Sequence, residues 1–246
     1  MTQPATINGD DASHPYRRPK DAATLILVDR SGTVPKVLVG RRHDRLVFMP
    51  GRFVFPGGRV DPSDNRVPLA RPLPKALEHK LLSGAPKIAA ARARAIAVAA
   101  IREVCEETGL CLGCKAASPL EATQATALAG EWKPFAEARL LPDPSHLFLI
   151  ARAITPPGLV RRFDTRFFAA DASAIVHKID GIVRPDAELV ELVWIELGSS
   201  PIEGMHQITR RVLGELEARL ATGPLSHAAE VPFFHFRSGE MRRDTL

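Results

Sequence analysis

Short runs of apolar residues, many of them β-branched, are separated along the chain by polar turn residues. This pattern is typical of β-strands. The first two runs, residues 23–28 and 36–42, flank a turn at residues 31–33 and predict a β-hairpin. Further strands are predicted at residues 53–55, 147–154, 166–170 and 189–195.

Two segments have the periodicity of helices. Residues 88–108 contain no glycine or proline and are rich in alanine, the strongest helix former. Gly109 follows them, where a helix commonly ends on a glycine. Residues 209–220 carry apolar side chains at helical spacing. Because hairpins and long crossings are mixed, we expect an α/β fold with a mixed β-sheet between helices.

The chain divides into a polar tail at residues 1–20 and one predicted domain at residues 21–246. Within the domain, residues 61–87 hold several prolines and predict an inserted loop with one short helix over residues 75–82. No apolar run is long enough to span a bilayer, and the tail lacks the pattern of a secretory signal. We therefore expect a cytoplasmic protein that does not enter a membrane.

The charge balance favours an anionic partner. The net charge is +5 and the pI is about 9.4, and arginine outnumbers lysine. Arginine suits discrete, forked contacts to phosphate. The sequence shows no helix-turn-helix, aromatic platform motif or dense lysine stripe, so we do not expect a nucleic acid partner.

Three cysteines stand at positions 105, 111 and 114. This small, odd number argues against a disulfide framework. Cys111 and Cys114 form a C-x-x-C pair, but no further cysteine or histidine lies near with the spacing of a zinc site. We expect the cysteines to be small packing residues.

Three glutamates near the end of the first long helix carry the candidate chemistry. Glu103, Glu106 and Glu107 are spaced i, i+3 and i+4, so they share one face of the helix. Like charges held together repel, and carboxylates at a helix C-terminus oppose the helix dipole. A divalent cation with oxygen ligands would relieve both conflicts. The alternative is a solvated acidic helix face.

The residues around these glutamates decide between the two. Residues 102–110 read Arg-Glu-Val-Cys-Glu-Glu-Thr-Gly-Leu. They resemble the second half of the Nudix box, G-x5-E-x7-R-E-U-x-E-E-x-G-U with U apolar, and match it at every fixed position. The preceding Phe55-Pro56-Gly57-Gly58 resembles the usual entry to the box. The resemblance implies a Nudix-type α/β/α sandwich.

The sequence departs from the box twice. Asp64 stands where the family has its first glutamate, and residues 65–101 separate it from Arg102, where the motif has seven positions. An insertion in the loop before a helix need not move the helix. In the family the first glutamate braces the arginine, so Asp64, or alternatively Asp61, is expected to do so here.

The resemblance also implies roles for individual residues. Glu103, Glu106 and Glu107 would bind Mg²⁺ or Mn²⁺ and form the catalytic set with Arg102, which would brace the loop. Gly58 would lend a carbonyl oxygen to the metal. Glu188 and Glu191, just before Trp194, are candidates for the general base. Exposed strand-edge carboxylates are the alternative interpretation of that pair.

Similarity beyond the box points to one branch of the family. Phe48-Met49-Pro50-Gly51 and residues 161–168 resemble the branch with an inserted box that includes peroxisomal coenzyme A diphosphatase. The polar residues that coenzyme A hydrolases carry near Gly40 and Val47 are missing. Candidates for contacts to the substrate phosphates are Arg42, Arg59, Arg161 and Arg162, with Arg166 beside them.

We therefore predict a metal-dependent hydrolase of the phosphoanhydride bond in a nucleoside diphosphate linked to another group, such as coenzyme A, ADP-ribose or a nucleotide sugar. A nucleoside triphosphate pyrophosphohydrolase and a non-catalytic Nudix-like ligand-binding domain are the alternatives. The aromatic residues at 233–236 can pack on the domain, contact a second subunit of a homodimer, or stack on substrate. The sequence leaves those three uses open.

Overall fold

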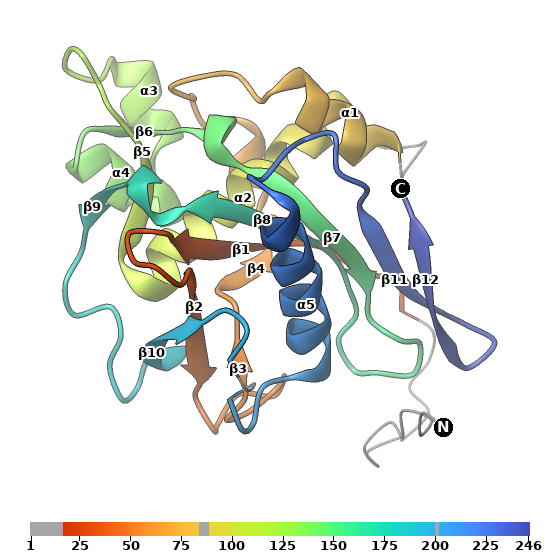
Figure 1. The fold of residues 1–246 in the computed structure, drawn as a ribbon. Coiled ribbons are helices and arrows are strands. Elements are labelled where there is room, and N and C mark those ends of the chain that lie inside the picture. The colour runs from red at the N-terminus through yellow and green to blue at the C-terminus, as the bar shows by residue number, and fades with distance from the viewer. Residues whose placement is uncertain (1–16, 84–88, 200–201) are drawn as a thin grey trace.

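The computed structural model describes residues 17–83, 89–199 and 202–246. A large mixed sheet is its centre, with the strand order β10-β2-β1-β8-β7-β11-β12 and with β3 and β4 added to β2 and β1. A second, small sheet has the order β6-β5-β9. Figure 1 shows α2 on one face of the large sheet and α5 on the other.

The strands are β1 (Lys20–Asp29), β2 (Lys36–Arg42), β3 (Phe53–Val54), β4 (Gly57–Arg59), β5 (Leu110–Lys115), β6 (Leu140–Pro142), β7 (Phe148–Ile154), β8 (Phe163–Asp171), β9 (Ile175–Lys178), β10 (Leu189–Glu196), β11 (Pro232–Arg237) and β12 (Glu240–Thr245). The α-helices are α1 (Lys75–Ser83), α2 (Ala90–Thr108), α3 (Ala122–Ala127), α4 (Lys133–Glu137) and α5 (Gln207–Thr222).

Strand β1 lies at the middle of the large sheet and runs parallel to β8. Its side chains are buried continuously from Ala22 to Val28, as expected for a strand covered on both faces. Leu25 and Leu27 join the core on the α2 side, while Ile26 and Val28 join the core on the α5 side. Alternation along this strand therefore divides the apolar residues between two cores.

The predicted elements are largely present. Strand β2 has the predicted bounds, β1, β8 and β10 each cover their predicted runs, and β7 begins one residue after its predicted start. Helix α2 ends at Gly109, whose φ of 76° is in the left-handed region and whose N–H donates to the Cys105 carbonyl. The predicted start of this helix, Ile88, lies outside the described residues, as do residues 1–16 of the predicted tail.

The proline-rich segment after β4 is more than a surface loop. It contains a short 3₁₀ helix, Pro62–Asn65, and α1, which agrees with the predicted helix. Val67, Leu77 and Leu81 of this segment are almost fully buried in the core that α2 shares. The expectation of an inserted loop is therefore incomplete: these side chains fill the core on the α2 side, so we expect that shortening the segment would cost stability.

The expectation for the cysteines is also wrong in part. Cys105 and Cys111 form a disulfide, with their Cα atoms 4.6 Å apart. The turn at Gly109 reverses the chain between α2 and β5 and brings the two residues together. Cys114 stays a free thiol.

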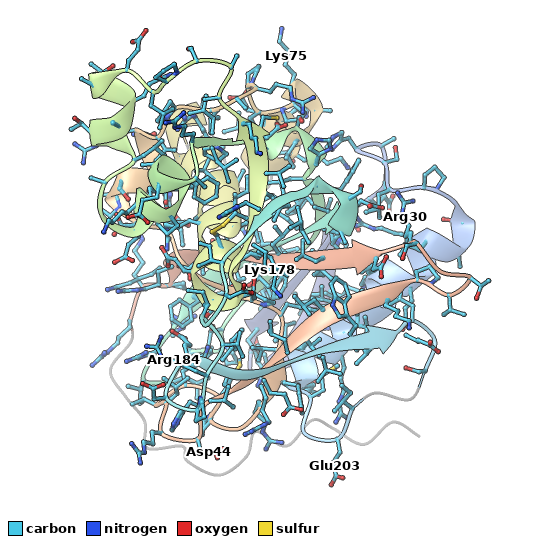
Figure 2. All side chains as sticks on the ribbon, turned by 90° about the vertical axis from the view of Figure 1, so that its left-hand side faces the viewer. Arg30, Asp44, Lys75, Lys178, Arg184 and Glu203 are labelled. Atoms are coloured by element: carbon cyan, nitrogen blue, oxygen red, sulfur yellow. A yellow bond between two sulfur atoms is a disulfide. The ribbon has the colours of Figure 1, made fainter. Side chains whose placement is uncertain are left out.

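Most charged side chains project from the surface, as Lys75, Lys178 and Glu203 do in Figure 2. Asp64, Arg102 and Glu107 are instead buried. Charged groups are seldom buried unless they have partners or a function. Within the described residues, no helix is both long and apolar enough to cross a membrane.

Candidate active site

The three glutamates lie on the last two turns of α2 and face the loop that enters β4. The Gly57 N–H donates a hydrogen bond of 2.9 Å to Oε2 of Glu107. A Cβ atom at Gly58 would lie 2.5 Å from both carboxylate oxygens of Glu103. A side chain at position 58 would therefore displace the Glu103 carboxylate, and glycine lets the backbone approach it closely.

Arg102 ties this end of α2 to the preceding segment. Its Nε and Nη2 donate to the two oxygens of Asp64 at 2.9 and 3.2 Å, and Nη2 also donates to the Arg59 carbonyl at 2.8 Å. Asp64 further accepts from Nε1 of Trp132 at 3.1 Å. Asp61, the alternative brace, instead accepts from the Ser63 N–H and caps the short 3₁₀ helix.

The same arginine contacts two of the glutamates. Nη1 of Arg102 lies 2.9 Å from Oε1 of Glu103 and 3.0 Å from Oε2 of Glu106. In the described part of the chain, no three histidine, cysteine, aspartate or glutamate side chains already converge on one point as metal ligands. The other oxygen of Glu106, Oε1, is buried and accepts no hydrogen bond.

These observations fit a divalent cation. A buried oxygen without a donor is costly unless a ligand satisfies it. The donor set, three carboxylates beside a glycine backbone, has the hard oxygen chemistry that Mg²⁺ and Mn²⁺ prefer. Glu103, Glu106 and Glu107 are therefore the residues that could hold such an ion.

Burial dominates the electrostatics of the cluster. It raises the pKa of both Glu103 and Glu106 from 4.5 to about 7, although Arg102 opposes the shift. Burial also raises the pKa of Glu107 well above its usual value, and the charges of Glu103 and Glu188 add to that effect. Negative charge is thus unfavourable here, and the site favours ligands that bring positive charge.

The two candidates for the general base lie in different places. Glu188 lines the same cleft as the cluster and pairs with Nη1 of Arg42 at 2.8 Å. Its charge acts on Glu103 and Glu107, so it is a further carboxylate of this region, as is Glu131, whose charge acts on Glu106. Glu191 pairs with Arg41 and does not line the cleft.

A cleft of about 1130 Å³ opens in front of the glutamates. Glu103 and Glu106 lie in its wall together with Gly57 and Gly58. Six arginines also line this cleft: Arg42, Arg52, Arg59, Arg102, Arg161 and Arg210. A cleft that joins buried carboxylates to several arginines suits a ligand that carries phosphate groups.

The predicted arginines divide into two groups. Arg59 and Arg161 are exposed in the cleft wall, and Arg42 lies there with its side chain held by Glu188 and the Phe48 carbonyl. Arg162 does not line the cleft: it is buried and donates to the carbonyls of Thr155 and Arg17.

Arg166 likewise does not line the cleft. It is only 2% exposed and forms ion pairs with Asp21 of β1 and Asp164 of β8. Arg162 and Arg166 therefore stabilise the fold in this structure, and we leave both out of the proposed binding set.

Comparison with solved structures identifies the fold. The chain is similar to a Nudix hydrolase from Alicyclobacillus acidocaldarius, with 27% identity, a TM-score of 0.56, and coverage of 86% of this chain and 99% of that one. The chain has the Nudix hydrolase fold. A MutT Nudix hydrolase from Burkholderia pseudomallei is a more distant match, at 15% identity and a TM-score of 0.45, and covers 81% of this chain and 99% of its own. No protein-family model and no curated protein matches the chain.

The Nudix fold confirms the predicted α/β architecture with a mixed sheet between helices. Sequence reasoning missed the apolar half of the cleft, which is lined by Phe48, Phe163, Phe167, Phe234, Phe236 and Met241. The last three come from the C-terminal hairpin, whose place in the sheet has no local signal. The alternation of phenylalanines at 234 and 236 was the one available hint of a strand.

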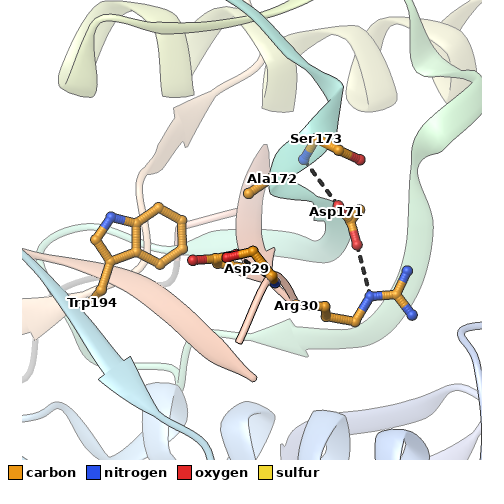
Figure 3. Close-up of a pocket in the computed structure, with 7 residues that line it drawn as sticks. Asp29, Arg30, Asp171, Ala172, Ser173 and Trp194 are labelled. Atoms are coloured by element: carbon orange, nitrogen blue, oxygen red, sulfur yellow. Dashed lines mark hydrogen bonds and ion pairs between the residues drawn. The ribbon is translucent and has the colours of Figure 1, made fainter. Parts of the chain in front are cut away.

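A second hollow of about 780 Å³ lies at the C-terminal end of β1, whereas β4 and the glutamate site lie near its N-terminal end (Figure 3). Its carboxylates are already satisfied within the fold: Asp29 accepts from the Ser31 N–H, and Asp171 accepts from Arg30 and the Ser173 N–H. Strand β1 pairs with Gly58 at Ala23, six residues away from Asp29, about 20 Å along a strand. This hollow is therefore separate from the glutamate site.

Proposed function

We propose that this protein is a Nudix hydrolase that cleaves a phosphoanhydride bond in a nucleoside diphosphate linked to another group. One observation carries the proposal: Glu107 and Glu103 of the Nudix-like motif lie against the Gly57–Gly58 backbone, and Glu103 and Glu106 line a cleft rich in arginine. Buried carboxylates, a close backbone and surrounding positive charge are what metal-assisted attack on a diphosphate requires.

Each part of the site has a distinct task in this proposal. Glu103, Glu106 and Glu107 would hold Mg²⁺ or Mn²⁺, and the Gly58 carbonyl would add a further oxygen. Such an ion would neutralise charge on the diphosphate and lower the pKa of an attacking water. Arg102, fixed by Asp64, sets the position of Glu103 and Glu106.

The remaining groups orient the reactants. Glu188 is the candidate general base, because it lies in the cleft close enough to act on the charges of Glu103 and Glu107. A base needs to reach the water that attacks the phosphorus. Arg59 and Arg161 are exposed in the cleft wall and can donate to the substrate phosphates.

Coenzyme A, ADP-ribose and nucleotide sugars are the proposed substrate class. The assignment to the coenzyme A branch rests on the sequence motifs alone. Hydrolysis of such a substrate gives two phosphorylated products, whereas a triphosphate pyrophosphohydrolase releases inorganic diphosphate from a nucleoside triphosphate. Product analysis therefore separates the two activities.

The test is a panel assay with Mg²⁺ or Mn²⁺ against these compounds, dinucleoside polyphosphates and nucleoside triphosphates. We expect metal-dependent cleavage of the diphosphate-linked class, lost in Glu106→Gln and kept in Glu191→Gln. Glu191 is the matched control because it is a glutamate outside the cleft. Full activity of Glu106→Gln would refute the site, and metal and ligand binding without turnover of any compound would favour the non-catalytic alternative.

A further inference from the structure

The C-terminal hairpin forms one wall of the active-site cleft. Strand β11 adds to the sheet parallel to β7, with Phe234 level with Ala153, and β12 pairs with β11 at the edge. The hairpin is the dark blue pair of strands beside β7 in Figure 1. Phe234, Phe236 and Met241 from this hairpin line the cleft.

The register decides which side chains face the cleft. Phe234 and Phe236 share one face of β11, and Met241 lies directly across from Phe236 in β12. Phe234 is only 3% exposed and is part of the core on the α5 side. Phe236 and Met241 are only partly buried, so they present apolar surface to the cleft.

Contacts on both faces hold the hairpin in place. On the face away from the cleft, Phe233 stacks on His235 with ring centroids 4.7 Å apart, and the Arg152 guanidinium lies 4.5 Å above the Phe233 ring. On the face toward the cleft, Arg243 donates two hydrogen bonds to Glu215 of α5. These contacts, with the pairing of β11 to β7, hold the strand that carries Phe236 in place.

A second aromatic wall stands opposite. Phe163 begins β8, packs edge-to-face on Phe48 with a centroid distance of 5.3 Å, and accepts a backbone hydrogen bond from Thr155. Because β11 runs parallel to β7 and Phe234 is level with Ala153, Phe236 is level with Thr155. It lies on the side of β7 that is opposite β8. Thr155, Phe163 and Phe236 all line the cleft, so this register places the small side chain of Thr155 between the two phenylalanines, as the floor of a slot.

The width of this slot suits a flat ring. Two strand spacings separate β8 from β11, about 10 Å. A ring midway between the two phenylalanines would lie about 5 Å from each, within the range of 4.5–7 Å that aromatic pairs prefer. The slot centre is three strand spacings, about 15 Å, from β4, whose Gly58 lies against Glu103.

We propose that this slot, bounded by Phe163, Phe236 and Met241, binds an aromatic ring of the substrate, and that Phe236 and Met241 select substrates that carry one. The inference rests on the proposed function, since it assigns the diphosphate to the glutamate end of the same cleft. Arg59 and Arg161 line the cleft as well and suit the connecting phosphates. The ring class that fits is a nucleobase.

The test compares ADP-ribose with its counterpart that lacks the adenine ring, in which the diphosphate joins two riboses. We expect Phe236→Ala and Met241→Ala each to lower kcat/KM for ADP-ribose about tenfold or more, and for the ring-free compound less than about threefold. Phe236→Trp keeps an aromatic wall and should retain activity on ADP-ribose. Arg242→Ala is the control, because Arg242 is exposed, outside the cleft, and pairs with Glu240.

A binding measurement separates this inference from the proposed function. Calorimetric titration with AMP and with ribose 5-phosphate, in the absence of divalent cations, needs no turnover. Weaker AMP binding in the alanine variants, with ribose 5-phosphate unchanged, supports the slot even if no compound is hydrolysed. Equal losses for both compounds, or no loss for AMP in folded Phe236→Ala and Met241→Ala, would overturn it.

Discussion

The bond between Asp64 and Arg102 gives the sharpest test of how this site is built. Asp64 is fully buried, its partner Arg102 is 4% exposed, and both guanidinium contacts are shorter than 3.3 Å. Asp64→Asn keeps the shape of the side chain and removes its charge. The guanidinium would then be buried with only Glu103 and Glu106 to balance it.

The cost follows from the burial of the pair. Removing one partner of a buried ion pair costs about 3–5 kcal/mol, because it leaves the other charge uncompensated. Since Nη1 of Arg102 keeps its two glutamates, the lower end of that range applies. We expect Asp64→Asn to lower the free energy of unfolding by about 3 kcal/mol, a large part of the 5–15 kcal/mol typical of a domain.

Urea denaturation at pH 7 measures this loss. With a slope of about 2–3 kcal/mol per molar urea, the midpoint should fall by about 1–1.5 M. Asp61→Asn is the matched control, since Asp61 is exposed and caps only a short 3₁₀ helix; its cost should stay near 1 kcal/mol. Equal midpoints for the two variants would refute the view that Asp64 balances the Arg102 charge. In Asp64→Asn we also expect less stabilisation by Mg²⁺, because Arg102 then competes more strongly for the glutamates.

Three further changes test other parts of the structure. Leu77→Ala should lower stability by about 2–5 kcal/mol by urea denaturation, because it leaves a cavity in the core; no loss would restore the loop interpretation of the insertion. Cys111→Ser should cost about 2 kcal/mol relative to the oxidised protein and nothing relative to the reduced protein, since the disulfide closes a short loop. In the metal-free protein, Glu103→Gln should raise stability by about 1–3 kcal/mol at pH 8 and change it little at pH 4.5. The pKa of Glu103 in the folded protein is raised to about 7, so the stability of the unsubstituted protein falls as pH rises from 4.5 through 7. Melting temperatures measured in EDTA that do not change over this pH range would contradict this prediction.

The sequence determined the parts that depend on local pattern. The alanine-rich run, the glycine after it and the i, i+3, i+4 spacing predicted α2, its end at Gly109 and a shared face for three glutamates. Periodicity alone also located β2, β7 and β10. These features were predictable because helical and strand periodicity act between neighbours in the chain. The resemblance to the Nudix box added Arg102 and offered Asp64 or Asp61 as its partner, and the structure has Asp64.

Tertiary structure alone decided the features that join distant segments. The C-terminal hairpin pairs with β7, some eighty residues earlier, and brings Phe236 and Met241 to the cleft. Glu188 joins the glutamates and Glu191 does not, although both precede Trp194 in the same strand region. The burial of α1 and the pairing of Cys105 with Cys111 likewise depend on how the chain folds back on α2. Sequence pattern says which side chains share a face of one element, but the partner of that face is chosen by burial of apolar surface across the whole molecule.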